Sequence, residues 1–196
     1  MTLTNGRRLA TVVAALALAT ACVAPGALAG PAADKASEAE ALLGEGKAGE
    51  ALSAFDEAIE AFWQGSPLQF RAVLFADAVA AFGKYEPRPN AIFRAGESVT
   101  VYLEPIGYAF VSAGGFHRVA FATGIEIRTP GGLILGATED FGELIWSGRA
   151  KSREVHAAIS VTLPQIKPGD YELLLTLTDQ ASKKTATVTL PFTIAG

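Results

Sequence analysis

The spacing of the apolar residues changes near residue 84, and this change constrains the fold more than any other feature. Between about residues 38 and 82, apolar residues recur at steps of three and four, which is typical of amphipathic helices. Beyond residue 84 they alternate with polar residues, so that Val99, Val101 and Leu103 share one side of an expected strand. The pattern predicts an α+β chain, with helices first and an antiparallel β-sandwich second.

The segment 38–83 is expected to hold a short helical hairpin and a third helix. The hairpin helices cover about 38–45, after Ser37 as N-cap, and about 48–63. The third covers about 67–82, where Ser66-Pro67 resembles a helix start and Gly83 a C-cap. Residues 30–37 are small and polar and predict a linker. Residues 84–89 contain two prolines and predict an extended connector.

Residues 90–196 are expected to form the sandwich, with about eight or nine short strands. Turns rich in Gly, Pro and Asp separate the strands. After the strand around residues 98–104, further strands are expected at 107–111, 116–122, 124–129, 133–136, 142–147, 152–163, 170–178 and 185–194. This number and spacing of strands fits a sandwich of about 100 residues.

Two stretches resemble known structural units. The run Pro168-Gly169-Asp170-Tyr171 and the two alternating strands after it resemble the closing strands of bacterial immunoglobulin-like or fibronectin-like domains, which implies architecture but not function. Residues 39–59, with Gly46, Glu50-Ala51 and Phe55 at characteristic spacing, resemble a single tetratricopeptide repeat. One repeat cannot bury its own apolar face, so the hairpin is expected to pack on the third helix or on the sandwich. The combination is similar to secreted proteobacterial proteins and implies no activity.

The first 29 residues have the three parts of an export signal. Arg7 and Arg8 precede an apolar run over 9–24, and Ala27-Leu28-Ala29 provides a small-x-small exit. The pattern predicts a periplasmic or secreted protein cut after Ala29. The remaining chain then has 14 basic and 20 acidic residues and no cysteine, so no disulfide is expected within it.

Cys22 leaves a second processing route open. The run Leu18-Ala19-Thr20-Ala21-Cys22 resembles a bacterial lipobox, in which the cysteine becomes the lipid-modified N-terminus. On that route the product is a membrane-anchored lipoprotein. Release after Ala29 is the favoured route, and membrane contact is expected only if Cys22 is lipidated.

Sequence motifs for catalysis and cofactors are few. The chain has no Walker A pattern and no Gly-x-Ser-x-Gly. His117 and His156 are far apart and have no metal-ligand neighbour at helical spacing, so no metal or cofactor is expected. Acidic residues outnumber basic ones, which argues against a nucleic-acid partner. An enzyme is the less favoured reading. It would be a carboxylate-dependent hydrolase with Glu139, Asp140 or Glu143 as acid and base, residues that otherwise predict a solvated turn or a weak calcium loop.

Two groups of residues are weak candidates for binding. Arg149, Lys151 and Arg153 alternate, so in a strand they share a face that can meet a carboxylate or an anionic headgroup, or can protect a sheet edge. A second group is expected around the junction of helices and sandwich, where a binding surface or interdomain packing would use aromatic side chains: Tyr85, Arg88, Tyr102 and Tyr108. The sequence therefore favours an exported, non-enzymatic binding or assembly module whose partner is another envelope protein.

Overall fold

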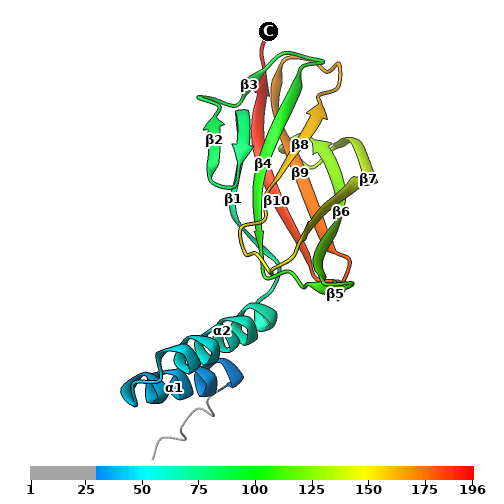
Figure 1. Ribbon diagram of the computed structural model, residues 1–196. Helices are drawn as coiled ribbons and strands as arrows, with labels where there is room; N and C mark the ends of the chain where they lie inside the picture. Colours follow the sequence, from blue (N-terminus) through cyan, green and yellow to red (C-terminus); the bar gives the residue numbers. More distant parts are fainter. Residues whose placement is uncertain (1–29) are drawn as a thin grey trace, which may run out of the picture.

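The computed structural model describes residues 30–196, which form two helices followed by ten strands in two sheets (Figure 1). The predicted signal segment and Cys22 lie outside these residues. The helices are α1 (Pro31–Gly44) and α2 (Ala48–Gly65). The strands are β1 (Gln69–Ala81), β2 (Lys84–Pro87), β3 (Ile92–Phe93), β4 (Ser98–Ile106), β5 (Val111–Ala113), β6 (Phe116–Arg128), β7 (Ile134–Gly148), β8 (Ala157–Thr162), β9 (Gly169–Asp179) and β10 (Thr185–Ile194). The α+β class predicted from the periodicity is confirmed.

The two helices pack side by side through alanines. The residues at their contact are each 5% exposed: Ala39 on α1 and Ala51, Ala54 and Ala58 on α2. Small side chains allow two helices to approach closely, but they bury little apolar surface. α1 begins earlier than predicted, because Pro31 starts the helix and Gly30 is its N-cap in place of Ser37. Most of the expected linker over 30–37 is therefore helical.

The predicted third helix is wrong, because residues 69–81 form strand β1. This strand pairs antiparallel with β4 and places Phe70, Val73 and Phe75 against the core. The alanines and the Ser66-Pro67 start favour a helix locally, but pairing with β4 overrides that preference. Gly83, expected as a C-cap, instead has a φ of 65° in the tight turn from β1 to β2, so the expected connector begins as strand β2.

The strands form two sheets that share one core. One sheet has the order β2-β1-β4-β8, and the other has the order β3-β10-β9-β6-β5 with β7 also paired to β6. The pairings are antiparallel, except that β3 and β10 run parallel. Leu103 of β4 and Leu173, Leu175 and Leu177 of β9 are fully buried between the sheets. On β9 the three leucines alternate with half-buried residues, which is the period-two pattern that the sequence shows.

Several strand boundaries differ from the prediction. β6 joins two expected strands, and β7 joins the expected strands at 133–136 and 142–147. The acidic run between the latter two is a bulge and not a turn, because residues 139–141 lie opposite Gly124 alone in the pairing of β6 with β7. The strand expected at 107–111 is not formed, since β5 begins at Val111, and the one expected at 152–163 shortens to β8.

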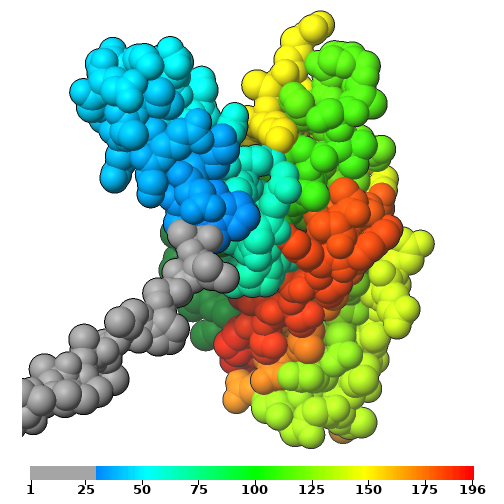
Figure 2. Space-filling view, turned by 90° about the horizontal axis from the view of Figure 1, so that it is seen from below, coloured from blue at the N-terminus to red at the C-terminus, as the bar shows by residue number. Residues whose placement is uncertain are grey.

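The helical hairpin projects from one end of the sheets, opposite the C-terminus (Figure 1). The space-filling view from below shows it as a lobe beside the sheets, and they do not cover the face of the hairpin seen in this view (Figure 2). No helix within residues 30–196 is both long and apolar enough to cross a membrane.

Candidate functional site

Trp63 joins the base of α2 to the sheets. Its indole N–H donates to the carbonyl oxygen of Tyr108 at 2.8 Å, and the two rings meet edge to face at 5.1 Å. Tyr108 is fully buried and donates its hydroxyl to the carbonyl of Ser152 at 2.8 Å. Burial raises the pKa of the Tyr108 phenol, because a phenolate there would lose its hydration. The junction is therefore filled with packed aromatic rings.

Glu60 forms the ionic contact at this junction. Its carboxylate accepts hydrogen bonds from Lys151 Nζ at 2.7 Å and from Arg153 at 3.1 Å, and Gln64 donates a further one at 2.8 Å. Burial raises the pKa of Glu60, but the hydrogen bonds from Lys151 and Gln64 and the two positive charges outweigh it and lower the pKa. The carboxylate is therefore ionised at neutral pH.

The basic residues predicted to share a strand lie instead in the loop between β7 and β8. Lys151 and Arg153 do meet a carboxylate, but it belongs to Glu60 of the same chain. The Arg149 guanidinium lies over the ring of Phe116, 5.0 Å from its centroid. Lys151 and Arg153 therefore connect the sheets to the hairpin, an arrangement that alternation along the sequence does not indicate.

Lys184 is a second connection that the sequence pattern did not single out. Its ammonium group donates to the carbonyl oxygens of Gln64 at 2.7 Å, Ser66 at 2.6 Å and Gly107 at 3.0 Å. These bonds use all three donors of the ammonium group. Gly107 has a φ of 81°, and a Cβ there would lie 2.2 Å from the carbonyl oxygen of Pro67, so only glycine fits beneath the chain leaving α2.

Of the four aromatic and basic residues expected at the junction, the structure places only Tyr108 there. Tyr85 and Tyr102 stack at 4.2 Å away from it, and the Tyr102 hydroxyl donates to Glu104 at 2.6 Å. Burial and this bond raise the pKa of Tyr102 to about 12. Arg88 pairs with Glu97 at 3.0 Å and covers Phe93. These residues form separate packing clusters.

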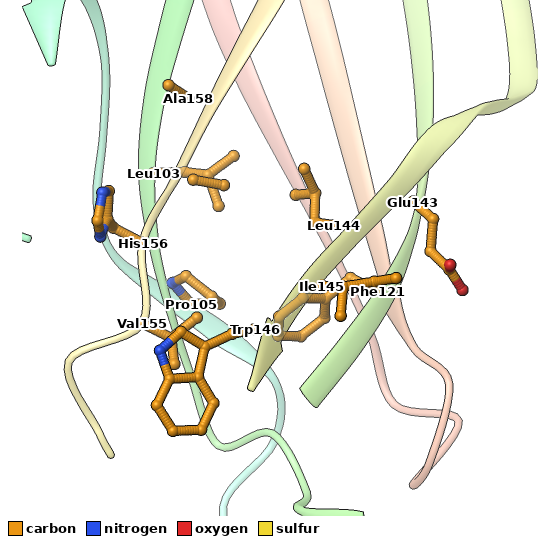
Figure 3. A pocket seen from close by; sticks show the side chains of 11 residues that line it. Leu103, Pro105, Phe121, Glu143, Leu144, Ile145, Trp146, Val155, His156 and Ala158 are labelled. Carbon is orange, nitrogen blue, oxygen red and sulfur yellow. The ribbon is translucent and has the colours of Figure 1, made fainter. Parts of the chain in front are cut away.

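A small crevice opens between the edge strands β7 and β8 (Figure 3). Its volume is about 250 Å³, and it is lined by apolar side chains that include Leu103, Leu144 and Trp146. His156 lies on the opposite side of this space from Glu143, whose carboxylate points away from it (Figure 3). The imidazole and the carboxylate therefore do not face one another across the crevice.

The acidic residues considered for hydrolysis do not converge on a cavity. Glu139, Asp140 and Glu143 are exposed on β7, and Glu143 accepts a hydrogen bond from Gln180. His117 is hydrogen-bonded to Ser112 at 2.8 Å. Within residues 30–196 no three His, Cys, Asp or Glu side chains gather as a metal site would require. Glu139 lines a surface hollow of about 490 Å³, whereas Glu143 lines the crevice between β7 and β8, so these two carboxylates border different hollows.

The largest exposed apolar side chains of the hairpin form a stripe. Its members are Leu43 of α1, exposed to 62%, and Leu52, Phe55 and Phe62 of α2, exposed to 69%, 48% and 71%. We call these four residues the apolar stripe. Three of the four, Leu43, Leu52 and Phe55, line a groove of about 390 Å³ between the helices, together with Ala39, Glu40, Ala48 and Ala51. The helix expected to cover this face is strand β1, which explains why the stripe is open.

No protein-family model matches the chain, and no curated protein matches it. Among solved structures, Spo0M, a sporulation control protein from Bacillus subtilis, is distantly similar, with a TM-score of 0.34 and 8% sequence identity. The similarity covers 67% of this chain and 50% of Spo0M, so the chain spans about half the length of that protein. A similarity this low says nothing about function.

The hairpin also carries the net charge of residues 30–196. Residues 30–65 have eight acidic and two basic side chains, whereas residues 66–196 have twelve of each. Both hairpin lysines are already paired, Lys35 with Glu38 and Glu57 and Lys47 with Glu45. Four hairpin carboxylates form no ion pair with any residue of 30–196: Asp34, Glu40, Glu50 and Asp56. The stripe therefore lies on a strongly acidic unit.

Proposed function

We propose that this chain is an exported, non-enzymatic binding or assembly module of the bacterial cell envelope. In this proposal an immunoglobulin-like β-sandwich holds the helical hairpin, and the hairpin docks on another envelope protein. The observation that carries the proposal is the exposure of the apolar stripe, whose four large side chains are about half exposed or more.

The energetics of burial support a docking role for the stripe. Large apolar side chains exposed singly are common on protein surfaces, but four on one face of a two-helix unit are characteristic of an interaction surface. Removing each from water contributes on the order of 1–2 kcal/mol. The bonds of Trp63, Glu60 and Lys184 already hold the base of the hairpin, so docking orders little additional chain.

Site-specific photocrosslinking in living cells tests the docking role. A photoreactive residue in place of Leu52 should give a discrete crosslinked species heavier than the chain. The matched control is Thr187, an exposed residue on the outer face of β10 that should give no such species. Monomer alone at both positions, or the same products at both, would contradict the proposal.

The location of the protein is proposed from its N-terminal residues. A periplasmic or secreted product cut after Ala29 should begin at Gly30, and the intact mass of the protein recovered from cells reads this directly. A diacylated chain beginning at Cys22 would instead make it a membrane-anchored lipoprotein. The hairpin can dock on a partner in either case.

A further inference from the structure

We infer that the docking partner presents a basic amphipathic α-helix, which lies along the hairpin groove with its apolar side chains on the stripe and its Lys and Arg side chains on the acidic rim. This inference rests on the proposed function, since it names the partner of the same surface. Three features of the hairpin carry it: the form of the groove, the positions of its carboxylates and the charge of the whole unit.

The form of the groove suits a helix. The stripe on α2 runs from Leu52 through Phe55 to Phe62, steps of three and seven that keep these residues on one side of the helix. Ten residues of helix span about 15 Å, or about three turns. A helical partner of similar length places its own i, i+3 and i+7 residues along this line. An extended peptide that binds by strand addition needs a sheet edge with free backbone groups, and α1 and α2 use theirs within the helices.

Carboxylates lie beside the stripe on both helices. Glu40 of α1 lines the groove, and Asp56 of α2 is one turn beyond Leu52. Neither forms an ion pair with another residue of 30–196, so a basic side chain that approaches them breaks no existing pair there. Lys and Arg on the flanks of an amphipathic helix would meet these carboxylates while its apolar residues meet the stripe.

The charge of the hairpin argues against a second copy of the chain as the occupant. A symmetric dimer through the stripe would bring two copies of the same surface together. Each copy carries eight acidic and two basic residues over 30–65, and the two basic residues are already paired. Like charges brought together at an interface oppose association, whereas a basic helix is attracted and its encounter is accelerated.

Binding of designed peptides to the full exported chain tests the inference. The probe is a labelled peptide of about 18 residues, long enough to be partly helical, with Leu at stripe spacing and Lys on both flanks. One control peptide has Glu in place of every Lys, and a second has the basic composition in scrambled order. Fluorescence anisotropy should show the basic amphipathic peptide binding at least about tenfold more tightly than either control, and its affinity should fall as salt rises.

Matched variants of the chain locate the binding. Replacing Leu52 and Phe62 together by Ala should weaken binding of the basic peptide about tenfold or more. Replacing Glu40 by Gln and Asp56 by Asn should weaken it by a smaller factor and reduce its dependence on salt. The control variant Thr187→Ala, on the outer face of β10, should bind as the unmodified chain does.

Four outcomes would overturn the inference. Equal binding of the acidic peptide would show that charge does not select the partner, and equal binding of the scrambled peptide would show attraction without a helical groove. Self-association of the chain that is lost in the Leu52 and Phe62 variant would assign the stripe to a second copy. No peptide binding despite a crosslinked species at Leu52 would show that the partner does not present a basic helix, while the proposed docking function would still hold.

Discussion

The hairpin and the two sheets bury apolar surface in opposite ways. The sheets enclose large side chains such as Leu103 and Leu175 at 0% exposure, and residues 66–196 have equal numbers of acidic and basic residues. The hairpin encloses only alanines, leaves its Leu and Phe side chains in solvent and holds four times as many acidic as basic residues. The sheets therefore have a closed core of large side chains, although Leu133 and Ile134 around the start of β7 are also exposed, whereas the hairpin packs through small side chains and leaves its largest apolar ones in solvent.

The largest predicted effect is the difference in stability between two Leu→Ala substitutions, one in each region. Leu103→Ala leaves a cavity among fully buried neighbours and should lower the free energy of unfolding by about 2–5 kcal/mol. Leu52→Ala removes a side chain that is already exposed and should change it by less than about 0.5 kcal/mol. Urea denaturation of both variants measures the difference.

The same two variants can also show that the hairpin and the sheets do not differ in this way. A cost for Leu52→Ala similar to that for Leu103→Ala would mean that the stripe is buried in the isolated chain, by the hairpin itself or by self-association. Repeating the denaturation at several protein concentrations separates these, because a self-associated fold gains stability as concentration rises.

The next largest effect concerns the junction between the two regions. Lys184→Met removes the ammonium group and leaves the carbonyls of Gln64, Ser66 and Gly107 without this donor. We expect a loss of about 1–3 kcal/mol in the free energy of unfolding, because partly buried acceptors lose their partner. Lys183→Met is the control, since Lys183 is exposed on the same turn. Equal effects of the two variants would show that Lys184 does not hold the hairpin base.

A smaller effect should appear within the sheets at alkaline pH. The folded-state pKa of Tyr102 is raised to about 12, while an unfolded tyrosine ionises near about 10. The contribution of protonated Tyr102 to the stability of the fold is therefore fully present below about pH 10 and is lost as the pH rises through about 12. Tyr102→Phe should flatten this fall in stability, measured by urea denaturation, and should itself cost about 1 kcal/mol by removing the bond to Glu104. An unchanged alkaline profile in Tyr102→Phe would refute this assignment.

The sequence predicts well where local pattern and tertiary packing agree. The helix expected over 48–63 matches α2, and the strands expected at 170–178 and 185–194 match β9 and β10, because alternation and the Pro-Gly-Asp turn indicate the same structure. β1 was missed because its helix-like composition conflicts with its pairing to β4, a contact that no local window contains.

The same limit applies to the candidate site. The helical periodicity over residues 38–82 predicts an apolar face on α2, but the exposure of Leu52, Phe55 and Phe62 depends on β1 being a strand instead of a covering helix. Lys151 and Arg153 were singled out, yet their partner Glu60 lies about 90 residues earlier in the chain, beyond any sequence motif. Lys184 binds backbone carbonyls, which leave no trace in the pattern of side chains.

The smallest predicted effect is the acid sensitivity of the junction. Attraction from Lys151, Gln64 and Arg153 outweighs burial and lowers the folded-state pKa of Glu60. Its stabilisation is therefore present above the ordinary carboxyl pKa of about 4.3 and is lost as the pH falls through the lower folded-state value. Because Lys151 and Arg153 are partly exposed to solvent, we expect their ion pairs with Glu60 to contribute no more than about 1 kcal/mol to the free energy of unfolding. Glu60→Gln should lose this amount at pH 7 and show a weaker acid dependence than the unmodified chain in urea denaturation. As a control, Glu57→Gln removes the exposed ion pair with Lys35 within the hairpin, and its acid dependence should match that of the unmodified chain. If Glu60→Gln leaves the acid dependence of the stability unchanged, the ion pairs of Glu60 do not help to hold the hairpin on the sheets. Trp63 and Lys184 would then hold it.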